Sequence, residues 1–167
     1  VRLFHLADEP IEAARALWAQ GSRSEAVAIL IDKELWLEAA RCQLDGDDLP
    51  GAMASLQRIP PSSPHYRQAC CSLIQMAHDH KLNPRHFEQR LEIWHRAAPL
   101  NLAELQALYL WARLLEDNGE SSKAAQCYKR VHDHRPGHAD VTMRLRRIAA
   151  QGGPRLIPEP IHTPQAA

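Results

Sequence analysis

Apolar residues recur at three- and four-residue steps through most of the chain, which is the spacing of one face of an α-helix. Near the start this pattern runs through Ile11 and Leu17, stops at Gly21, and resumes with Ala26 and Leu30. A glycine at this point favours a turn, because it reaches backbone conformations that other residues avoid. The pattern therefore predicts two consecutive helices joined by a tight turn, a helical hairpin, over residues 9–30.

The same arrangement recurs further along the chain. We expect a second hairpin over residues 34–60, a third over 64–94 with a longer turn at 81–87, a fourth over 102–134, and a single amphipathic helix over 139–150. Pro50 suits the first turn of its helix, where the missing N–H costs no hydrogen bond. The predicted fold class is all-α, with about four antiparallel hairpins and a C-terminal capping helix.

The domain organisation follows from the same pattern. We expect one helical repeat domain at residues 9–151, preceded at 1–8 by a short lead-in or the remnant of another element. Residues 152–167 are rich in Pro and Gly and are expected to form a disordered tail. The chain begins with Val1 rather than Met, which is consistent with a piece of a longer protein.

The charges are balanced overall but are unevenly distributed. Of the 167 residues, 45% are hydrophobic and 24% charged, with a net charge of zero, as in an ordinary folded protein. Residues 1–59 hold 6 basic and 10 acidic side chains, whereas residues 119–155 hold 8 basic and 3 acidic ones. Opposite charge at the two ends raises the possibility of self-association.

The fourth hairpin has the most regular spacing of packing and turn positions. Its small residues Ala112 and Ala124 allow close helix approach, Gly119 suits the turn, and Tyr128 fills the space between the helices. The complete set is Leu108, Trp111, Ala112, Leu115, Gly119, Ala124, Tyr128, Val131 and Pro136. This set resembles the tetratricopeptide repeat superfamily. The upstream hairpins match the same pattern more weakly, and in the second of them Asp47 stands in place of the usual Gly. The resemblance covers roughly residues 9–150.

The resemblance implies a right-handed superhelical solenoid whose concave groove binds a peptide or a partner domain. In such repeats the first helix of each hairpin lines the groove. The groove residues implied here are Arg15, Arg41, Gln75, Gln106, Tyr109 and Arg113. The expected function is that of a non-enzymatic protein–protein interaction scaffold. The chain would then be a helical-repeat region of a larger bacterial-type signalling or assembly protein.

Two interpretations of the groove arginines remain open. They can pair with carboxylates of an acidic partner segment. Alternatively, Arg41 and Arg113 each have an aspartate four residues further on, Asp45 and Asp117, and pairs at this spacing neutralise each other on one helix. Trp18 has the same ambiguity, between the hydrophobic core and the groove.

Two other functions compete with the scaffold. The uneven charge favours a structural spacer or self-assembly element that joins an acidic N-terminal end to a basic C-terminal end. Basic residues near the C-terminus also suggest nucleic-acid binding, but the chain has neither interleaved aromatic residues there nor an overall basic charge. These basic residues are Lys129, Arg130, Arg135, Arg144, Arg146 and Arg147.

The sequence contains no recognisable catalytic, cofactor-binding or metal-binding motif. No phosphate-binding glycine loop is present, and the four cysteines have no framework spacing, which predicts reduced thiols. The His-Asp-His runs at 78–80 and 132–134 place their histidines on nearly opposite sides of a helix, so we expect no metal site. We therefore expect neither an enzyme nor a cofactor.

The chain also lacks the patterns of membrane and exported proteins. No run of about 18 apolar residues could cross a membrane, and the first residues do not have the basic-then-apolar layout of a signal peptide. We therefore expect no membrane partner and a cytoplasmic location.

Overall fold

The computed structural model describes residues 9–96, 100–154 and 156, and within these ranges all regular secondary structure is helical. The prediction of an all-α chain is confirmed. The α-helices are α2 (Pro10–Ala19), α3 (Arg23–Asp32), α4 (Trp36–Asp45), α5 (Leu49–Arg58), α6 (Tyr66–Asp79), α7 (Glu88–Arg96), α8 (Leu102–Asp117), α9 (Ser121–His134) and α10 (Val141–Ala150), with a 3-10 turn, η1, at Pro84–His86. The predicted lead-in at 1–8 and most of the predicted tail lie outside the described residues.

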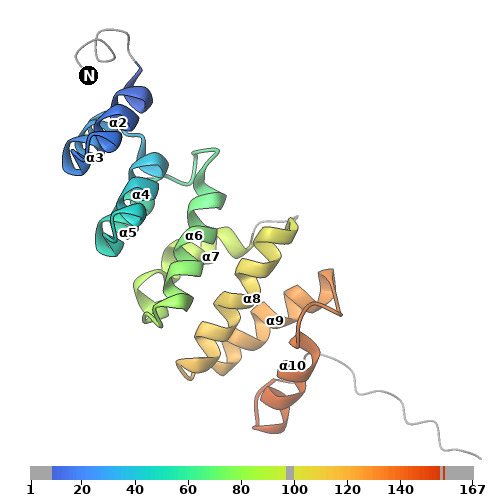
Figure 1. Ribbon diagram of the computed structural model, residues 1–167. Coiled ribbons are helices and arrows are strands. Elements are labelled where there is room, and N and C mark those ends of the chain that lie inside the picture. Colours follow the sequence, from blue (N-terminus) through green and yellow to red (C-terminus); the bar gives the residue numbers. More distant parts are fainter. Residues whose placement is uncertain (1–8, 97–99, 155, 157–167) are drawn as a thin grey trace, which may run out of the picture. The chain divides into compact units, whose positions relative to one another are not determined.

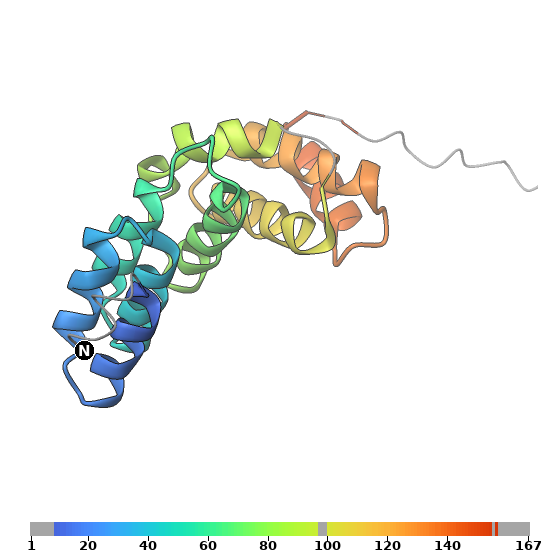
Figure 2. The same ribbon diagram turned by 90° about the horizontal axis from the view of Figure 1, so that it is seen from above.

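Consecutive helices pack in pairs. Helix α2 lies against α3, α4 against α5, and α8 against α9, as both views of the molecule show (Figures 1 and 2). Three of the predicted hairpins are therefore present at the expected positions. By its contacts the chain divides into two compact units, Val1–Leu73 and Ile74–Ala167, with the boundary inside α6.

The third predicted hairpin departs most from expectation, because its second helix does not begin as one continuous α-helix at Asn83. The Asn83 side chain accepts a hydrogen bond from the Arg85 N–H at 3.0 Å, which stabilises a single 3-10 turn from Pro84. Phe87 then has φ −120°, outside the helical range, and α7 starts only at Glu88. Local side-chain bonding at Asn83 competes with the α-helix here.

The tight hairpin turns share one backbone motif. Gly21 and Gly119 have left-handed backbones, with φ of 84° and 82°. In each turn the next N–H reaches back to a helix carbonyl, from Ser22 to Leu17 and from Glu120 to Leu115, both at 2.9 Å. These bonds satisfy carbonyls that the helix end leaves free. In the second hairpin Asp47 takes the glycine position, with φ of 61°.

The Asp47→Gly variant is expected to stabilise the protein by about 0.5–1 kcal/mol, because glycine adopts the left-handed backbone without the steric cost that aspartate incurs. The measurement is chemical denaturation followed by circular dichroism. Gly119→Ala is the matched reverse control, since a Cβ there meets no atom within 4 Å and only the backbone conformation is strained. A destabilised Asp47→Gly would contradict this account.

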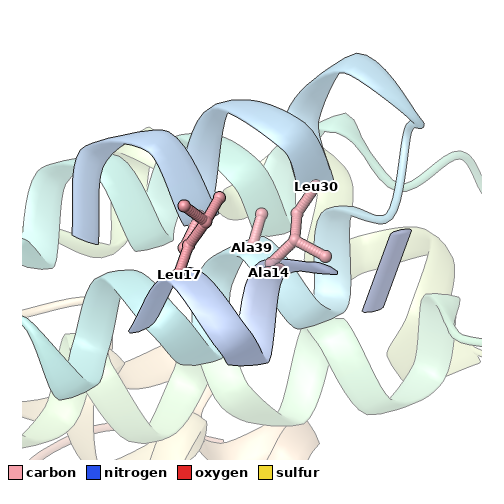
Figure 3. Close-up of a cluster of buried hydrophobic side chains, with 5 residues drawn as sticks. Ala14, Leu17, Leu30 and Ala39 are labelled. Carbon is pink, nitrogen blue, oxygen red and sulfur yellow. The ribbon is translucent and has the colours of Figure 1, made fainter. Parts of the chain in front are cut away.

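Each unit has its own core. In the first unit Ala14 and Leu17 of α2 meet Leu30 of α3 and Ala39 of α4, and all four side chains are buried (Figure 3). In the second unit Ala112, Ala124 and Tyr128 are each 0% exposed. The packing roles predicted for the small residues and for Tyr128 in the fourth hairpin are confirmed.

Candidate functional site

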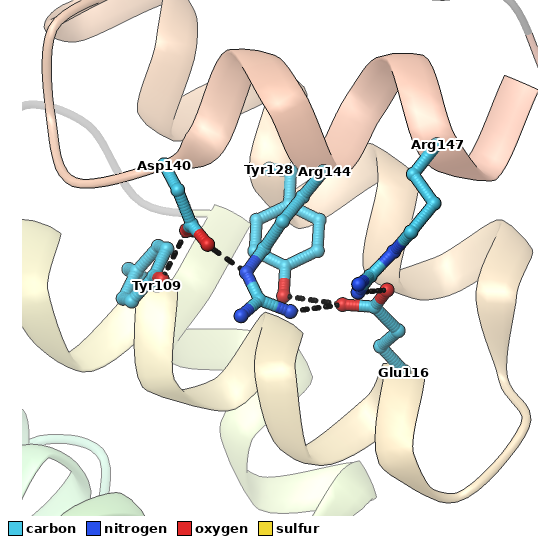
Figure 4. Close-up of polar contacts among 6 residues, drawn as sticks. All are labelled: Tyr109, Glu116, Tyr128, Asp140, Arg144 and Arg147. Atoms are coloured by element: carbon cyan, nitrogen blue, oxygen red, sulfur yellow. Dashed lines mark hydrogen bonds and ion pairs between the residues drawn. The ribbon is translucent and has the colours of Figure 1, made fainter.

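The most connected polar cluster of the second unit joins α10 to the fourth hairpin. The Glu116 carboxylate accepts hydrogen bonds from the Tyr128 hydroxyl and from Arg144 Nη1, both at 2.8 Å, and it also pairs with Arg147. Arg144 Nε donates to Asp140 at 2.9 Å. Figure 4 shows these contacts together with the hydrogen bond from the Tyr109 hydroxyl to Asp140.

Mutual hydrogen bonding sets the ionisation of this cluster. Burial disfavours the charged form of Glu116, but hydrogen bonds from Arg147, Tyr128 and Arg144 outweigh it and hold the pKa of Glu116 below its usual value. The pKa of Asp140 is lowered in the same way by Tyr109 and Arg144, against the effect of burial. Burial and the neighbouring Glu116 raise the pKa of the Tyr128 phenol. The two carboxylates therefore stay charged at neutral pH, and their bonds to the arginines hold α10 on the hairpin.

This cluster changes the interpretation of two sets of residues. Tyr109 is only 6% exposed and is bonded to Asp140, so it packs inside the unit rather than presenting an exposed ring in a groove. Arg144 and Arg147 are engaged by Glu116, and Lys129 pairs with Asp133 at 2.6 Å. These three basic residues, which the sequence suggests for nucleic-acid binding, are thus neutralised within the protein.

The predicted groove arginines differ in how they are paired. Arg15 forms an ion pair with Glu12 at 2.6 Å. Arg41 and Arg113, by contrast, form no ion pair with any residue that the structure describes, so the expected pairs with Asp45 and Asp117 are not formed. Arg41 is exposed, whereas Arg113 is half-buried with an Nε atom that has no hydrogen-bond partner. The interpretation of these two arginines as intrahelical ion pairs is therefore wrong.

The remaining predicted groove residues are polar and exposed. Gln75 donates to both carboxylate oxygens of Asp79, at 2.9 and 3.0 Å. Gln106 makes a hydrogen bond with the His138 ring at 3.0 Å. Arg15 and Arg41 belong to the first unit, and the other predicted groove residues belong to the second.

The first unit contains a cleft that the sequence did not predict. It has a volume of about 460 Å³ and lies where the turn between α2 and α3 neighbours the turn between α4 and α5. The residues that line it are Trp18, Arg23, Ser24, Val27, Cys42, Gln43, Gly46 and Asp48. In the sequence, the one indication of a binding surface in this region is Trp18, an aromatic residue next to a hairpin turn.

The two sides of the cleft carry opposite charge. On the α3 side the Arg23 guanidinium lies over the Trp18 ring, 5.1 Å from its centroid, and makes no ion pair with a described residue. On the α4 side burial raises the pKa of the Cys42 thiol, and the charges of Asp45 and Glu38 raise it further. Asp48 lines the cleft on the same side and adds a carboxylate there.

The histidine and cysteine residues give no metal centre in the described part of the chain. His78 contacts Asp79 at 3.3 Å and His132 lies 3.9 Å from Asp133, but no group of three or more potential ligands converges there. None of the four cysteines forms a disulfide bond, and burial raises the pKa of Cys127 to about 12. Such a thiol is protonated and unreactive at neutral pH.

None of the described helices is both long and apolar enough to span a membrane. Comparison of the chain with family models, curated proteins and solved structures finds no match.

Proposed function

We propose that this chain is a non-enzymatic scaffold of the tetratricopeptide type, a right-handed solenoid of helical hairpins that binds an acidic segment of a partner protein. The observation that carries the proposal is that Arg41 and Arg113 form no ion pair within the part of the chain that the structure describes. An arginine without a carboxylate in its own protein keeps its full capacity for bidentate pairing with one from a partner.

The positions of these arginines support a shared role. Arg41 follows Ala40 in the first helix of the second hairpin, and Arg113 follows Ala112 in the first helix of the fourth. The two alanines are 1% and 0% exposed, which orients both helices in the same way. The next residue points about 100° further around each helix. The two arginines therefore occupy equivalent positions relative to the packed side of their own hairpins.

The second unit adds polar contacts near its arginine. Gln106 lies on α8 about two turns before Arg113 and is exposed, with one side-chain oxygen bonded to His138. The exposed Leu102, with 67% of its surface accessible, extends the same helix face toward its N-terminus. An acidic segment with an apolar residue would match this surface, with the carboxylate toward Arg113.

Binding to an array of acidic, neutral and basic peptides of equal length tests this function. We expect the protein to bind acidic peptides in preference to the others. The affinity of the double variant Arg41→Gln/Arg113→Gln for these peptides is expected to be lower by a factor of about ten or more. The double variant Lys33→Gln/Arg135→Gln is the matched control, because it removes one exposed cation from each unit and neither forms an ion pair with a described residue. Equal weakening by the control, or no preference for acidic peptides, would reject the proposal.

A further inference from the structure

The cleft of the first unit is suited to a ligand that is both apolar and basic. Trp18 and Val27 supply an apolar wall, and Asp48 supplies a carboxylate of which only Oδ1 is used, as acceptor for the Gly51 N–H at 2.9 Å. Asp45 stands next to the cleft and is exposed. At about 460 Å³ the cleft has the size of a small-ligand site, so it accommodates side chains rather than a whole helix.

The exposed face of α10 has the complementary chemistry. Val141, Leu145 and Ile148 are buried against the rest of the second unit. The opposite face carries Met143, which is 66% exposed, and Arg146, which is exposed and has no ion pair with a described residue. These two residues are three positions apart and therefore neighbours on the helix surface. Methionine and arginine are both enriched at protein–protein interfaces.

We propose that α10 of one copy of this chain docks at the cleft of a second copy, with Met143 against Trp18 and Val27 and Arg146 toward Asp45 and Asp48. The contact joins different surfaces of the two copies, so it is head-to-tail and can extend beyond a dimer. Arg23 also lines the cleft, with its guanidinium over the Trp18 ring, so the proposal places Arg146 at Asp45 and Asp48 and not at Arg23. This inference does not depend on the peptide-binding function of Arg41 and Arg113.

Light scattering on the full chain at increasing concentration tests the contact. We expect the average mass to rise above the 18.8 kDa of one chain, and the rise to be lost at high salt, because exposed charges are screened. A mass of one chain at every concentration and salt level overturns the proposal. A rise that salt leaves unchanged also overturns it, since the pairing of Arg146 with the aspartates is then not involved.

Charge reversal identifies the two surfaces. Arg146→Glu and Asp45→Arg are each expected to abolish the rise in mass, because each variant places like charges at the contact. An equimolar mixture of the two variants is expected to associate again, since every contact between unlike chains then pairs opposite charges. Arg135→Glu is the control, as it makes the same charge change on an exposed residue just after α9.

The mixing experiment decides between a defined contact and general attraction. Retained association of Arg146→Glu alone, or a mixture that stays monomeric, overturns the proposal. Loss of association by Arg135→Glu equal to that by Arg146→Glu does so too, because net charge rather than α10 is then responsible. None of these results bears on the peptide array, so the two proposals fail separately.

Discussion

The Glu116→Ala variant is expected to lower the free energy of unfolding by about 3 kcal/mol. The Glu116 side chain is 11% exposed and accepts hydrogen bonds from Tyr128 and Arg144, the latter 14% exposed. Its removal leaves a buried phenol and a nearly buried guanidinium without their acceptor, and desolvation of those groups is no longer compensated. Urea denaturation followed by circular dichroism measures the loss.

Two further variants separate the network from a simple surface effect. Arg147→Ala removes a partner of the same carboxylate, but Arg147 is 54% exposed, so we expect a loss of about 1 kcal/mol or less. The double variant Glu116→Ala/Arg144→Ala is expected to lose clearly less than the sum of the two single losses, because the second change removes a charge already left unpaired. Additive losses would show that the network is not coupled.

Acid titration gives an independent view of the same network. The pKa values of Glu116 and Asp140 are lowered in the folded protein, so their contribution is complete above the ordinary pKa range of carboxyl groups, about 4. It is lost as the pH falls through the lowered values. Stability of Glu116→Ala is therefore expected to fall less steeply below pH about 4 than that of the unmodified protein.

The Leu30→Ala variant is expected to cost about 3 kcal/mol through a different mechanism, the loss of core packing. Leu30 is 1% exposed and, in the first unit, belongs to the cluster that joins α2, α3 and α4. Truncation leaves a cavity, because the helices that surround the side chain are tied by their own turns and cannot collapse completely. Thermal unfolding, with stability compared at one temperature, measures this effect.

The neighbouring residue provides the control for Leu30. Ile31 is 38% exposed, and Ile31→Ala removes a side chain of similar size from the same helix. Its expected cost is within about 1 kcal/mol, since little buried surface is lost. Equal losses for the two variants would mean that helix propensity, rather than the cluster of buried side chains, determines the stability of α3.

The hairpin turns show how far local sequence information reaches. Gly21 and Gly119 predict their turns because glycine adopts a left-handed backbone easily, and both residues have it. Asn83 and Pro84 predict the start of an α-helix, but the structure has a 3-10 turn at Pro84–His86. The hydrogen bond from the Arg85 N–H to the Asn83 side chain stops the α-helix before it forms. Competition between two local structures of similar energy is difficult to read from residue types alone.

The candidate surfaces depended far more on side-chain partners. Spacing alone allowed Arg41 to pair with Asp45 and Arg113 with Asp117, yet neither pair forms. Long side chains have several rotamers of similar energy, so the choice between a helical neighbour and solvent is made by the surroundings. Tyr109 was expected at an exposed wall and is instead covered, because the segment before α10 brings Asp140 to its hydroxyl.

The sequence by itself determined that this chain is helical, where most helices begin and end, and which small residues pack between them, because helix periodicity and glycine turns are local properties of the chain. The tertiary structure alone decided that Glu116 anchors α10 through Arg144 and Arg147, that Arg41 and Arg113 form no ion pair with a described residue, and that Trp18 lines a cleft. These features depend on residues far apart in the sequence, and no local pattern specifies which side chains meet after the hairpins have packed.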